Sequence, residues 1–157
     1  MSNAAIHKQR RDRLIQKMQR GITVIPTAPK MVRNGDSHYP YRYDSHFYYL
    51  TGFDEPEAVL VLVAGNEPQS VLFCREKNPE REIWDGYRHG PDAAKEMFCF
   101  DAAFPITQLD DKLTELMGNQ PALFHPVGHE TAWDARLLGL RSRVQAKARS
   151  GISAPNE

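Results

Sequence analysis

Cysteine, net charge and long apolar runs are all scarce in this chain, and each shortage removes a class of protein. The two cysteines, Cys74 and Cys99, are too few and too far apart for a disulfide scaffold or a zinc site of paired Cys-x-x-Cys motifs. Twenty basic residues balance 20 acidic ones, so no overall field would attract nucleic acid or anionic lipid. The longest apolar run, residues 58–64, is far shorter than the roughly 20 residues of a membrane-spanning helix. We therefore expect neither nucleic acid nor a membrane as a partner.

The common hydrolase and nucleotide-binding motifs are missing as well. The sequence contains no G-x-S-x-G, H-E-x-x-H, P-loop or G-x-G-x-x-G pattern. His125 and His129 are four residues apart, but Pro126 and Gly128 between them would break the helix that could turn both imidazoles toward one metal ion. We interpret this pair as part of a strand-to-helix turn, and we find no complete catalytic or metal-binding set.

A second group of histidines is interleaved with aspartates, at His38, His46, Asp36 and Asp44. The eight residues from the first histidine to the second are turn-rich and aromatic, so the sequence sets no common direction for the side chains. A structural hydrogen-bonded network is the favoured interpretation, with a metal site as the alternative.

What is present is the composition of one globular domain. The chain has 157 residues, of which 41% are hydrophobic and 25% charged, as in ordinary soluble domains. The first twenty residues are basic but lack the apolar segment and cleavage site of a secretory signal, which favours a cytoplasmic protein. Both cysteines are expected to be buried free thiols. Residues 1–5 are expected to be disordered or tag-like, 6–151 to form the domain, and 152–157 to be a truncated linker.

Hydrophobic periodicity predicts strands that alternate with helices. Residues 58–64 are apolar without interruption, which indicates a central strand covered on both faces, and the four-residue turn after it predicts an antiparallel hairpin. The predicted fold is a three-layer α/β domain, a mixed β-sheet with helices on both faces. The expected strands are residues 21–28, 31–34, 58–64, 69–76, 102–106 and 121–124. The expected helices are residues 6–20, 45–50, 92–98, 109–118 and about 131–149.

Helix starts and faces can be predicted from capping residues and periodicity. Ser45 is expected as an N-cap, and Thr107 and Thr131, each followed three residues later by aspartate, are expected to form capping boxes. The first helix presents an apolar face, and the basic residues around it are interpreted as solvated.

Aromatic and polar residues are most concentrated in residues 36–62, with the sequence DSHYPYRYDSHFYYLTGFDEPEAVLVL. Aromatic rings with polar tips suit a surface that is half buried and half wet. Arg42 stands between Tyr41 and Tyr43, where it could pair with an aspartate and stack on a ring. This loop is either held rigid by such pairs or lines a substrate entrance, and the two readings are compatible.

A polar, turn-rich segment at residues 77–91 is predicted to be a projecting loop. It contains Trp84 and Arg88, and tryptophan and arginine are the residue types that most often anchor interfaces. The alternative is that Trp84 folds back on its own domain. We predict that Trp84 and Arg88 contact another subunit or another domain.

Two segments resemble the amino-terminal domain of bacterial Xaa-Pro aminopeptidases. The first, from Asp36, reads D-S-x-Y-P-Y-R-x-D-S-x-F-x-Y-L-T-G-F-x-E-P, and the second, from Glu82, reads E-I-W-x-G-x-R-x-G. The resemblance extends from about Arg11 to the end of the chain. It implies the creatinase-type amino-terminal fold, which agrees with the architecture expected from periodicity.

The resemblance also implies a role. The intact enzymes of the family are metalloproteases that release the residue preceding proline, using two divalent metal ions, usually manganese, held in a carboxy-terminal catalytic domain. None of those ligands matches a position here, so we expect an inactive fragment without a cofactor of its own. Its implied partners are its own catalytic domain, the peptide substrate and further subunits of a homo-oligomer, a dimer or tetramer. The implied entrance or interface residues are Trp84, Arg88, Tyr41 and Arg42.

Two alternatives remain open. Aminopeptidase-like folds also occur as peptide- or protein-binding modules without peptidase activity, including histone chaperones. Creatine or other amidinohydrolase chemistry on the same architecture is less favoured, because the Y-P-Y-R and T-G-F segments resemble the aminopeptidase branch. The metal ligands encoded beyond Glu157, or their absence, would separate peptidase from binder.

Overall fold

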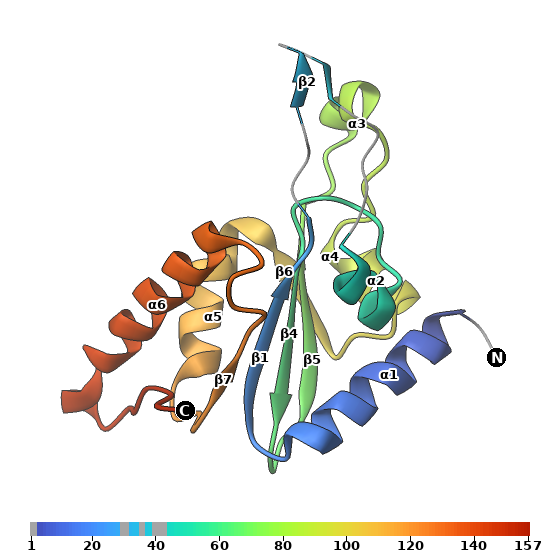
Figure 1. Ribbon diagram of the computed structural model, residues 1–157. Helices are drawn as coiled ribbons and strands as arrows, with labels where there is room; N and C mark the ends of the chain where they lie inside the picture. Colours follow the sequence, from blue (N-terminus) through green and yellow to red (C-terminus); the bar gives the residue numbers. More distant parts are fainter. Residues whose placement is uncertain (1–2, 29–31, 35–36, 39–43) are drawn as a thin grey trace.

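A computed structural model describes residues 3–28, 32–34, 37–38 and 44–157, with 32–34 and 37–38 described by their backbone alone. Its centre is a mixed β-sheet, which within these residues has five strands in the order β6-β5-β4-β1-β7 (Figure 1). β1 pairs antiparallel with β4 and β4 with β5, whereas β7 is parallel to β1 and β6 is parallel to β5. The strands are β1 (Gly21–Pro26), β4 (Val59–Ala64), β5 (Gln69–Cys74), β6 (Ala102–Pro105) and β7 (Leu123–Phe124).

The middle strand is the one that the apolar run predicted. Every residue of β4 is buried, and Val61 lies between Val24 of β1 and Val71 of β5 in the register. Its valines belong to one hydrophobic cluster and its leucines to another, because successive side chains of a strand point to opposite faces. The predicted antiparallel hairpin between β4 and β5 is confirmed.

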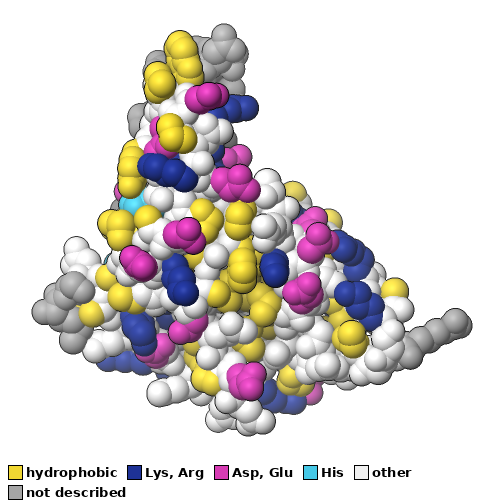
Figure 2. Space-filling view, turned by 180° about the vertical axis from the view of Figure 1, so that it is seen from behind, with side chains coloured by type: hydrophobic (Ala, Val, Ile, Leu, Met, Phe, Trp, Pro, Cys, Tyr) yellow, Lys and Arg dark blue, Asp and Glu magenta, His cyan; other side chains and the backbone are white. Residues whose placement is uncertain are grey.

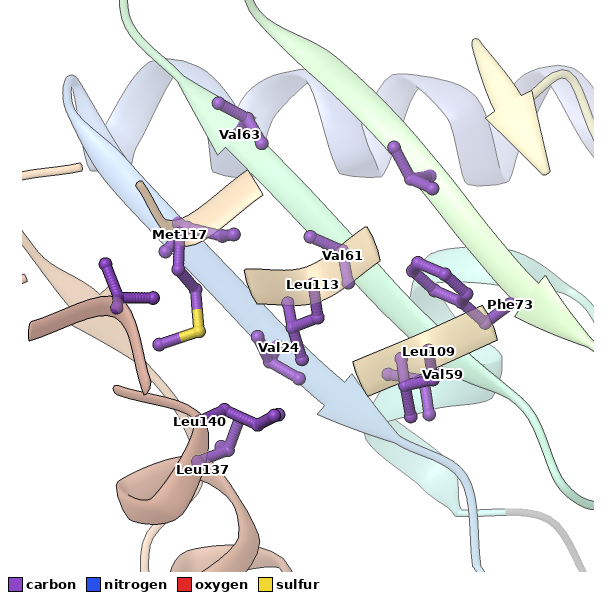
Figure 3. Close-up of a cluster of buried hydrophobic side chains, with 13 residues drawn as sticks. Val24, Val59, Val61, Val63, Phe73, Leu109, Leu113, Met117, Leu137 and Leu140 are labelled. Atoms are coloured by element: carbon purple, nitrogen blue, oxygen red, sulfur yellow. The ribbon is translucent and has the colours of Figure 1, made fainter. Parts of the chain in front are cut away.

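One face of the sheet is covered by α5 (Leu109–Met117) and α6 (Thr131–Gln145), as Figure 3 shows for the side chains between them. Leu109, Leu113 and Met117 of α5 are fully buried against the valines of the sheet. Removing an apolar side chain of this size from water contributes about 1.5–3 kcal/mol. This layer is therefore a major source of stability.

The other face is covered by α1 (Asn3–Met18), α2 (Ser45–Thr51) and α4 (Pro91–Met97). Phe47 and Phe53 are buried here, and the predicted apolar face of α1, including Leu14 and Met18, packs against the same cluster. The three-layer α/β fold, with helices on both faces of a mixed sheet, is thereby confirmed. No helix in the described part of the chain is both long and apolar enough to cross a membrane.

Arg11 contradicts the prediction that the basic residues of the first helix are solvated. It is fully buried, and its guanidinium donates to the backbone carbonyls of Leu50, Phe98 and Cys99 while lying 4.1 Å from the ring centroid of Phe100. Burial lowers the pKa of Arg11 to about 10, so the group stays charged at neutral pH. These carbonyls lie at the ends of α2 and α4, where the helix dipole favours a cation.

The predicted helix caps are wrong in detail. Asp44, not Ser45, caps α2 by accepting a hydrogen bond from the backbone N–H of Phe47 at 2.9 Å. Neither α5 nor α6 has a side-chain cap bond at its N-cap residue. Thr107 instead lies within a short 3-10 turn, and its hydroxyl contacts Glu76 at 3.5 Å.

Beyond the carboxyl ends of β1 and β5, three elements project from the body of the domain (Figure 1). They are β2 (Val32–Asn34), β3 (Ser37–His38) and α3 (Pro79–Asp85), which we call the arm. The prediction of a projecting loop was right about the projection and wrong about the structure, because residues 79–85 are helical. Asn78 caps this helix and Pro79 occupies its first turn, and none of its residues is buried.

Both ends of the described chain belong to helical or packed structure. Residues 3–5 are part of α1. Residues 152–157 pack on the domain, with Ile152 and Ala154 against the core. Glu157 donates its N–H to the carbonyl of Pro121 and accepts the N–H of Leu123 at 2.9 Å. This is the hydrogen-bond pattern of a parallel strand pair.

The two cysteines differ in their surroundings. Cys74 is buried as predicted, and desolvation raises the pKa of its thiol to about 12, which leaves it unreactive. Cys99 is only half-buried, so the prediction of burial fails for this residue. It follows α4 with a positive φ of 60°, a conformation that breaks the helix.

Candidate functional site

The tryptophan predicted to act at an interface lies on the outside of the arm. Trp84 is 86% exposed, and its neighbours Ile83 and Tyr87 are 79% and 63% exposed. Figure 2 shows hydrophobic side chains gathered on the projecting part of the molecule. Clustered exposed apolar residues on a soluble domain are typical of contact surfaces. We call these three residues the arm ridge; Trp84 does not fold back on its own domain.

Arg88 has a different environment from Trp84. Its side chain is mostly buried, 3.5 Å from the carboxylate of Asp85 and 3.4 Å from the carbonyl of Glu76. Its backbone N–H donates to Glu82 at 2.8 Å, and its carbonyl accepts from Lys77 at 2.7 Å. Arg88 therefore connects the segment that follows α3 with the segment that precedes it, and its side chain is not part of the arm ridge.

Glu82 connects these contacts. Its carboxylate accepts from the ammonium of Lys77 at 2.6 Å as well as from the backbone of Arg88. These two bonds, with that of Lys77 the larger contribution, lower the pKa of Glu82. The carboxylate therefore links α3 to the segments just before and just after it.

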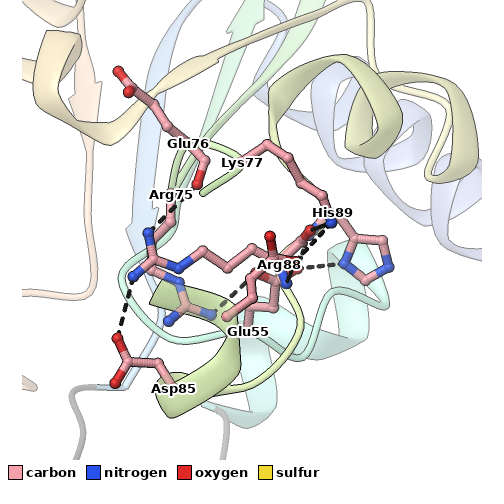
Figure 4. Close-up of polar contacts among 8 residues, drawn as sticks. Glu55, Arg75, Glu76, Lys77, Asp85, Arg88 and His89 are labelled. Atoms are coloured by element: carbon pink, nitrogen blue, oxygen red, sulfur yellow. Dashed lines mark hydrogen bonds and ion pairs between the residues drawn. The ribbon is translucent and has the colours of Figure 1, made fainter. Parts of the chain in front are cut away.

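At the base of the arm lies a buried ionic cluster that the sequence did not reveal (Figure 4). Glu55 accepts a hydrogen bond from Arg75 at 3.1 Å through one oxygen, and both the backbone N–H and the imidazole Nδ1 of His89 contact its other oxygen. Glu55 and Arg75 are both buried. The only hint in the sequence is a charged residue on either side of the buried hairpin. The cluster fixes the arm to the sheet.

The cluster borders a cavity of about 420 Å³ whose lining carries both signs of charge. Asp54, Glu55 and Asp85 supply carboxylates, and Arg75 and His89 supply potential cations. Among the described residues that line it, none supplies a sulfur ligand, and Glu55 already has its bonds within the protein. Within the described residues, no three His, Cys, Asp or Glu side chains are grouped so that they could hold a metal ion.

The structure describes only some of the residues in the predicted histidine groups and in the loop around Arg42. His125 and His129 do not share a ligand: Nδ1 of His125 lies 2.9 Å from the carbonyl of Val24, and His129 lies 2.9 Å from the carboxylate of Asp44. Tyr41, Arg42 and Asp36 lie outside the described residues, as does the side chain of His38. Asp44, the N-cap of α2, is thus paired with His129, which lies outside the predicted histidine and aspartate group.

Comparison with known proteins assigns the family. Residues 7–124 match the family described as aminopeptidase P, N-terminal domain. The Xaa-Pro aminopeptidase of Escherichia coli is 36% identical over 151 residues, which is 94% of this chain and 34% of that protein. Xaa-Pro aminopeptidase 3 of Dictyostelium discoideum is 43% identical over 106 residues, covering 66% of this chain and 20% of that protein.

Solved structures agree with the sequence matches. An aminopeptidase of Pseudomonas aeruginosa superposes with a TM-score of 0.94 at 41% identity, covering 99% of this chain and 36% of that one. The low-pH form of E. coli aminopeptidase P gives 0.93 at 34% identity, with the same coverage. The chain spans about a third of the length of these proteins. It therefore belongs to the Xaa-Pro aminopeptidase family and corresponds to the N-terminal domain of such an enzyme.

Proposed function

We propose that this chain is the non-catalytic N-terminal domain of a metal-dependent Xaa-Pro aminopeptidase, and that it shapes the entrance to the active site and supplies contacts between subunits. The observation that carries the proposal is the arm ridge, whose central residue, Trp84, is 86% exposed on a helix with no buried residue. An exposed tryptophan on a braced support is typical of an anchor that a partner covers.

The rest of the parent enzyme carries the chemistry in this proposal. No described group of side chains in this chain fits a metal ion, so no catalytic step is assigned to its residues. The two divalent ions, which we propose to be manganese, belong to the part of the parent enzyme that the chain does not cover. One solved relative is a zinc-substituted E. coli aminopeptidase P in complex with product, which supports metal dependence in that protein.

In this proposal the domain contributes by holding the arm ridge at a fixed place, and it takes no part in the chemical reaction. The buried contacts of Glu55 with Arg75 and His89 hold the base of the arm, and the bonds around Glu82 hold its helix. A ridge fixed in this way can meet a neighbouring subunit or the catalytic domain at a defined place and exclude folded substrates. We propose its own catalytic domain and further subunits as the partners.

Substitution of Trp84 in the parent enzyme tests this role. Trp84→Ala is expected to weaken subunit assembly, or to lower kcat/KM for an X-Pro peptide, by at least about tenfold, with an unchanged melting temperature. Met97→Ala is the matched control, because Met97 is 55% exposed on α4, outside the arm. Unchanged oligomer mass together with unchanged kinetics would contradict the proposal.

A binding module without peptidase activity is the second candidate, since the same exposed ridge could receive a peptide or protein. The two candidates differ in the parent protein. Manganese-dependent release of the residue before proline supports the aminopeptidase, whereas its absence from the intact, metal-loaded parent supports the binder. The chain alone, mixed with an X-Pro peptide and manganese, is expected to release nothing above a metal blank.

A further inference from the structure

A cavity of about 490 Å³ lies where α1 and α2 meet the end of β1. Its floor is apolar, formed by buried Ile25 and Leu50 with half-buried Leu14, and its rim carries basic side chains. We call this feature the basic pocket. Among the described residues that line it, none belongs to the arm ridge, so the two surfaces are separate. A pocket of this composition suits a ligand that is anionic and partly apolar.

Basic side chains from two helices surround the pocket. They are Arg10, Arg13 and Lys17 of α1 and His46 of α2. Positions 10, 13 and 17 are separated by three and four residues, which places them on one side of the helix. No acidic side chain occurs among the described lining residues. Because the 20 basic and 20 acidic residues of the chain balance, this local excess of positive charge is not a general property of its surface.

Two of these cations have no partner of their own within the described part of the chain. Arg13 and Lys17 are exposed, and neither forms a hydrogen bond or an ion pair with a described residue. Asp12 is the only acidic residue of α1, and its carboxylate pairs with Lys8 at 2.8 Å. Cations that lie close together without a counter-charge attract an anionic partner.

Arg10 is already held in place at the rim. Its guanidinium donates to the backbone carbonyl of Tyr49 at 3.1 Å and lies 4.1 Å from the centroid of the Tyr49 ring. A side chain fixed in this way loses less conformational freedom when it binds an anion. The contact also joins α1 to α2, so the rim is formed before a ligand binds.

The floor of the basic pocket distinguishes among anionic partners. Ile25 and Leu50 are 8% and 7% exposed, so they are recessed behind the charged rim, whereas a membrane-binding surface projects its apolar side chains into the lipid. Single-stranded nucleic acid stacks its bases on aromatic rings, but Arg10 already covers one face of the Tyr49 ring. A polypeptide can place one apolar side chain in the recess while its carboxylates meet the rim.

We propose that the basic pocket binds an acidic segment of a partner protein. Arg13 and Lys17 are four residues apart, about 6 Å along the helix axis. Alternate side chains of an extended peptide point the same way and are about 6.5–7 Å apart, so two carboxylates two residues apart match these cations. A further alternate side chain, an apolar one, enters the recess. The inference goes beyond the proposed function, because this partner is not a subunit of the enzyme.

Fluorescence anisotropy of a labelled peptide tests this inference in the intact parent protein. The probe is a peptide with the repeat Glu-Ser-Glu-Ser-Leu, which lacks the proline of an X-Pro substrate. The double variant Arg13→Glu with Lys17→Glu is expected to weaken binding of this peptide by at least about tenfold, because attraction becomes repulsion. Lys95→Glu, exposed on α4, is the matched control and is expected to weaken it by less than about twofold.

Two further measurements separate the parts of the proposed site. A peptide with serine in place of leucine should bind at least about fivefold more weakly, since nothing then fills the apolar recess. Higher salt should weaken binding of the first peptide, because the charges at the rim are exposed. Both protein variants should keep their melting temperatures within about 2 °C, which excludes unfolding as the cause of lost binding.

Several results would overturn the proposal. They are the absence of peptide binding to the unaltered protein, and equal binding to the unaltered protein and the double variant. Single-stranded RNA or a phosphatidylserine vesicle that binds at least about tenfold more tightly than the peptide assigns the pocket to nucleic acid or to lipid instead. A double variant whose oligomer dissociates assigns the pocket to a contact between subunits.

Activity measured on the same samples keeps this inference apart from the proposed function. The double variant should leave kcat/KM for an X-Pro peptide unchanged, because Arg13 and Lys17 lie outside the arm ridge. A parent protein without peptidase activity that still binds the acidic peptide removes the proposed function alone. An active parent protein that does not bind it removes the inference about the basic pocket alone.

Discussion

Arg11 donates through one guanidinium nitrogen to the backbone carbonyl of Leu50 at 2.9 Å, and this bond joins α1 to the last turn of α2. Its other terminal nitrogen reaches the carbonyls of Phe98 and Cys99 just after α4. One buried cation thus satisfies carbonyls at the ends of two helices that are far apart in the sequence. It is the central polar contact of the layer that covers this face of the sheet.

Removal of this guanidinium is expected to be strongly destabilising. Arg11→Met should lower the free energy of unfolding by about 3 kcal/mol, because three carbonyls lose their donor in a buried site. Arg13→Met, on the exposed side of the same helix, should change it by less than about 0.5 kcal/mol. Urea unfolding of both variants measures the difference. Equal, small effects would show that water replaces the guanidinium without loss.

The ionic cluster at the base of the arm should reveal itself through non-additive substitutions. Glu55→Met should cost about 3–5 kcal/mol, since it leaves the Arg75 guanidinium buried without its carboxylate. The double variant Glu55→Met with Arg75→Met should be more stable than Glu55→Met alone, because no uncompensated charge remains. Chemical unfolding of the two single variants and the double variant completes the cycle. Additive losses would mean that the two charges act independently.

The N-cap of α2 was predicted at Ser45 and lies at Asp44, so substitutions at these two adjacent residues should have different effects on stability. Asp44→Ala should lower the free energy of unfolding by about 1–2 kcal/mol, because its carboxylate accepts the N–H of Phe47 and pairs with His129. Ser45→Ala is the matched control and should have an effect below about 0.5 kcal/mol. Thermal unfolding of the two variants decides between them. A larger effect at Ser45 would restore the cap predicted from the sequence.

The contacts of Glu82 predict a pH dependence of the arm. Its pKa is lowered in the folded protein, chiefly by the Lys77 bond and then by the Arg88 backbone N–H. The stability that it contributes is therefore fully present above its ordinary pKa of 4.5 and is lost as the pH falls through the lower, folded value. NMR titration of the Glu82 carboxyl should give a pKa below 4.5, and Lys77→Met should raise it. A value that Lys77→Met leaves unchanged would be inconsistent with this account.

Local patterns were sufficient for most of the architecture. The uninterrupted apolar residues of β4 and the short turn after them specified a buried strand in an antiparallel hairpin, because burial on both faces leaves no polar alternation. The exposed position of Trp84 was also predictable, since it lies in a polar, turn-rich segment without hydrophobic periodicity.

The sequence by itself determined the family and the alternation of strands and helices, because both depend on residues that are neighbours in the chain. Only the tertiary structure decided that Arg11 is buried, that Glu55 meets Arg75 and His89, and that Asp44 pairs with His129. Each of these contacts joins residues that are 20 to 88 positions apart. From the sequence alone, such a charged residue is predicted to be exposed to solvent. The groups that form its hydrogen bonds and ion pairs come close to it only when the chain folds.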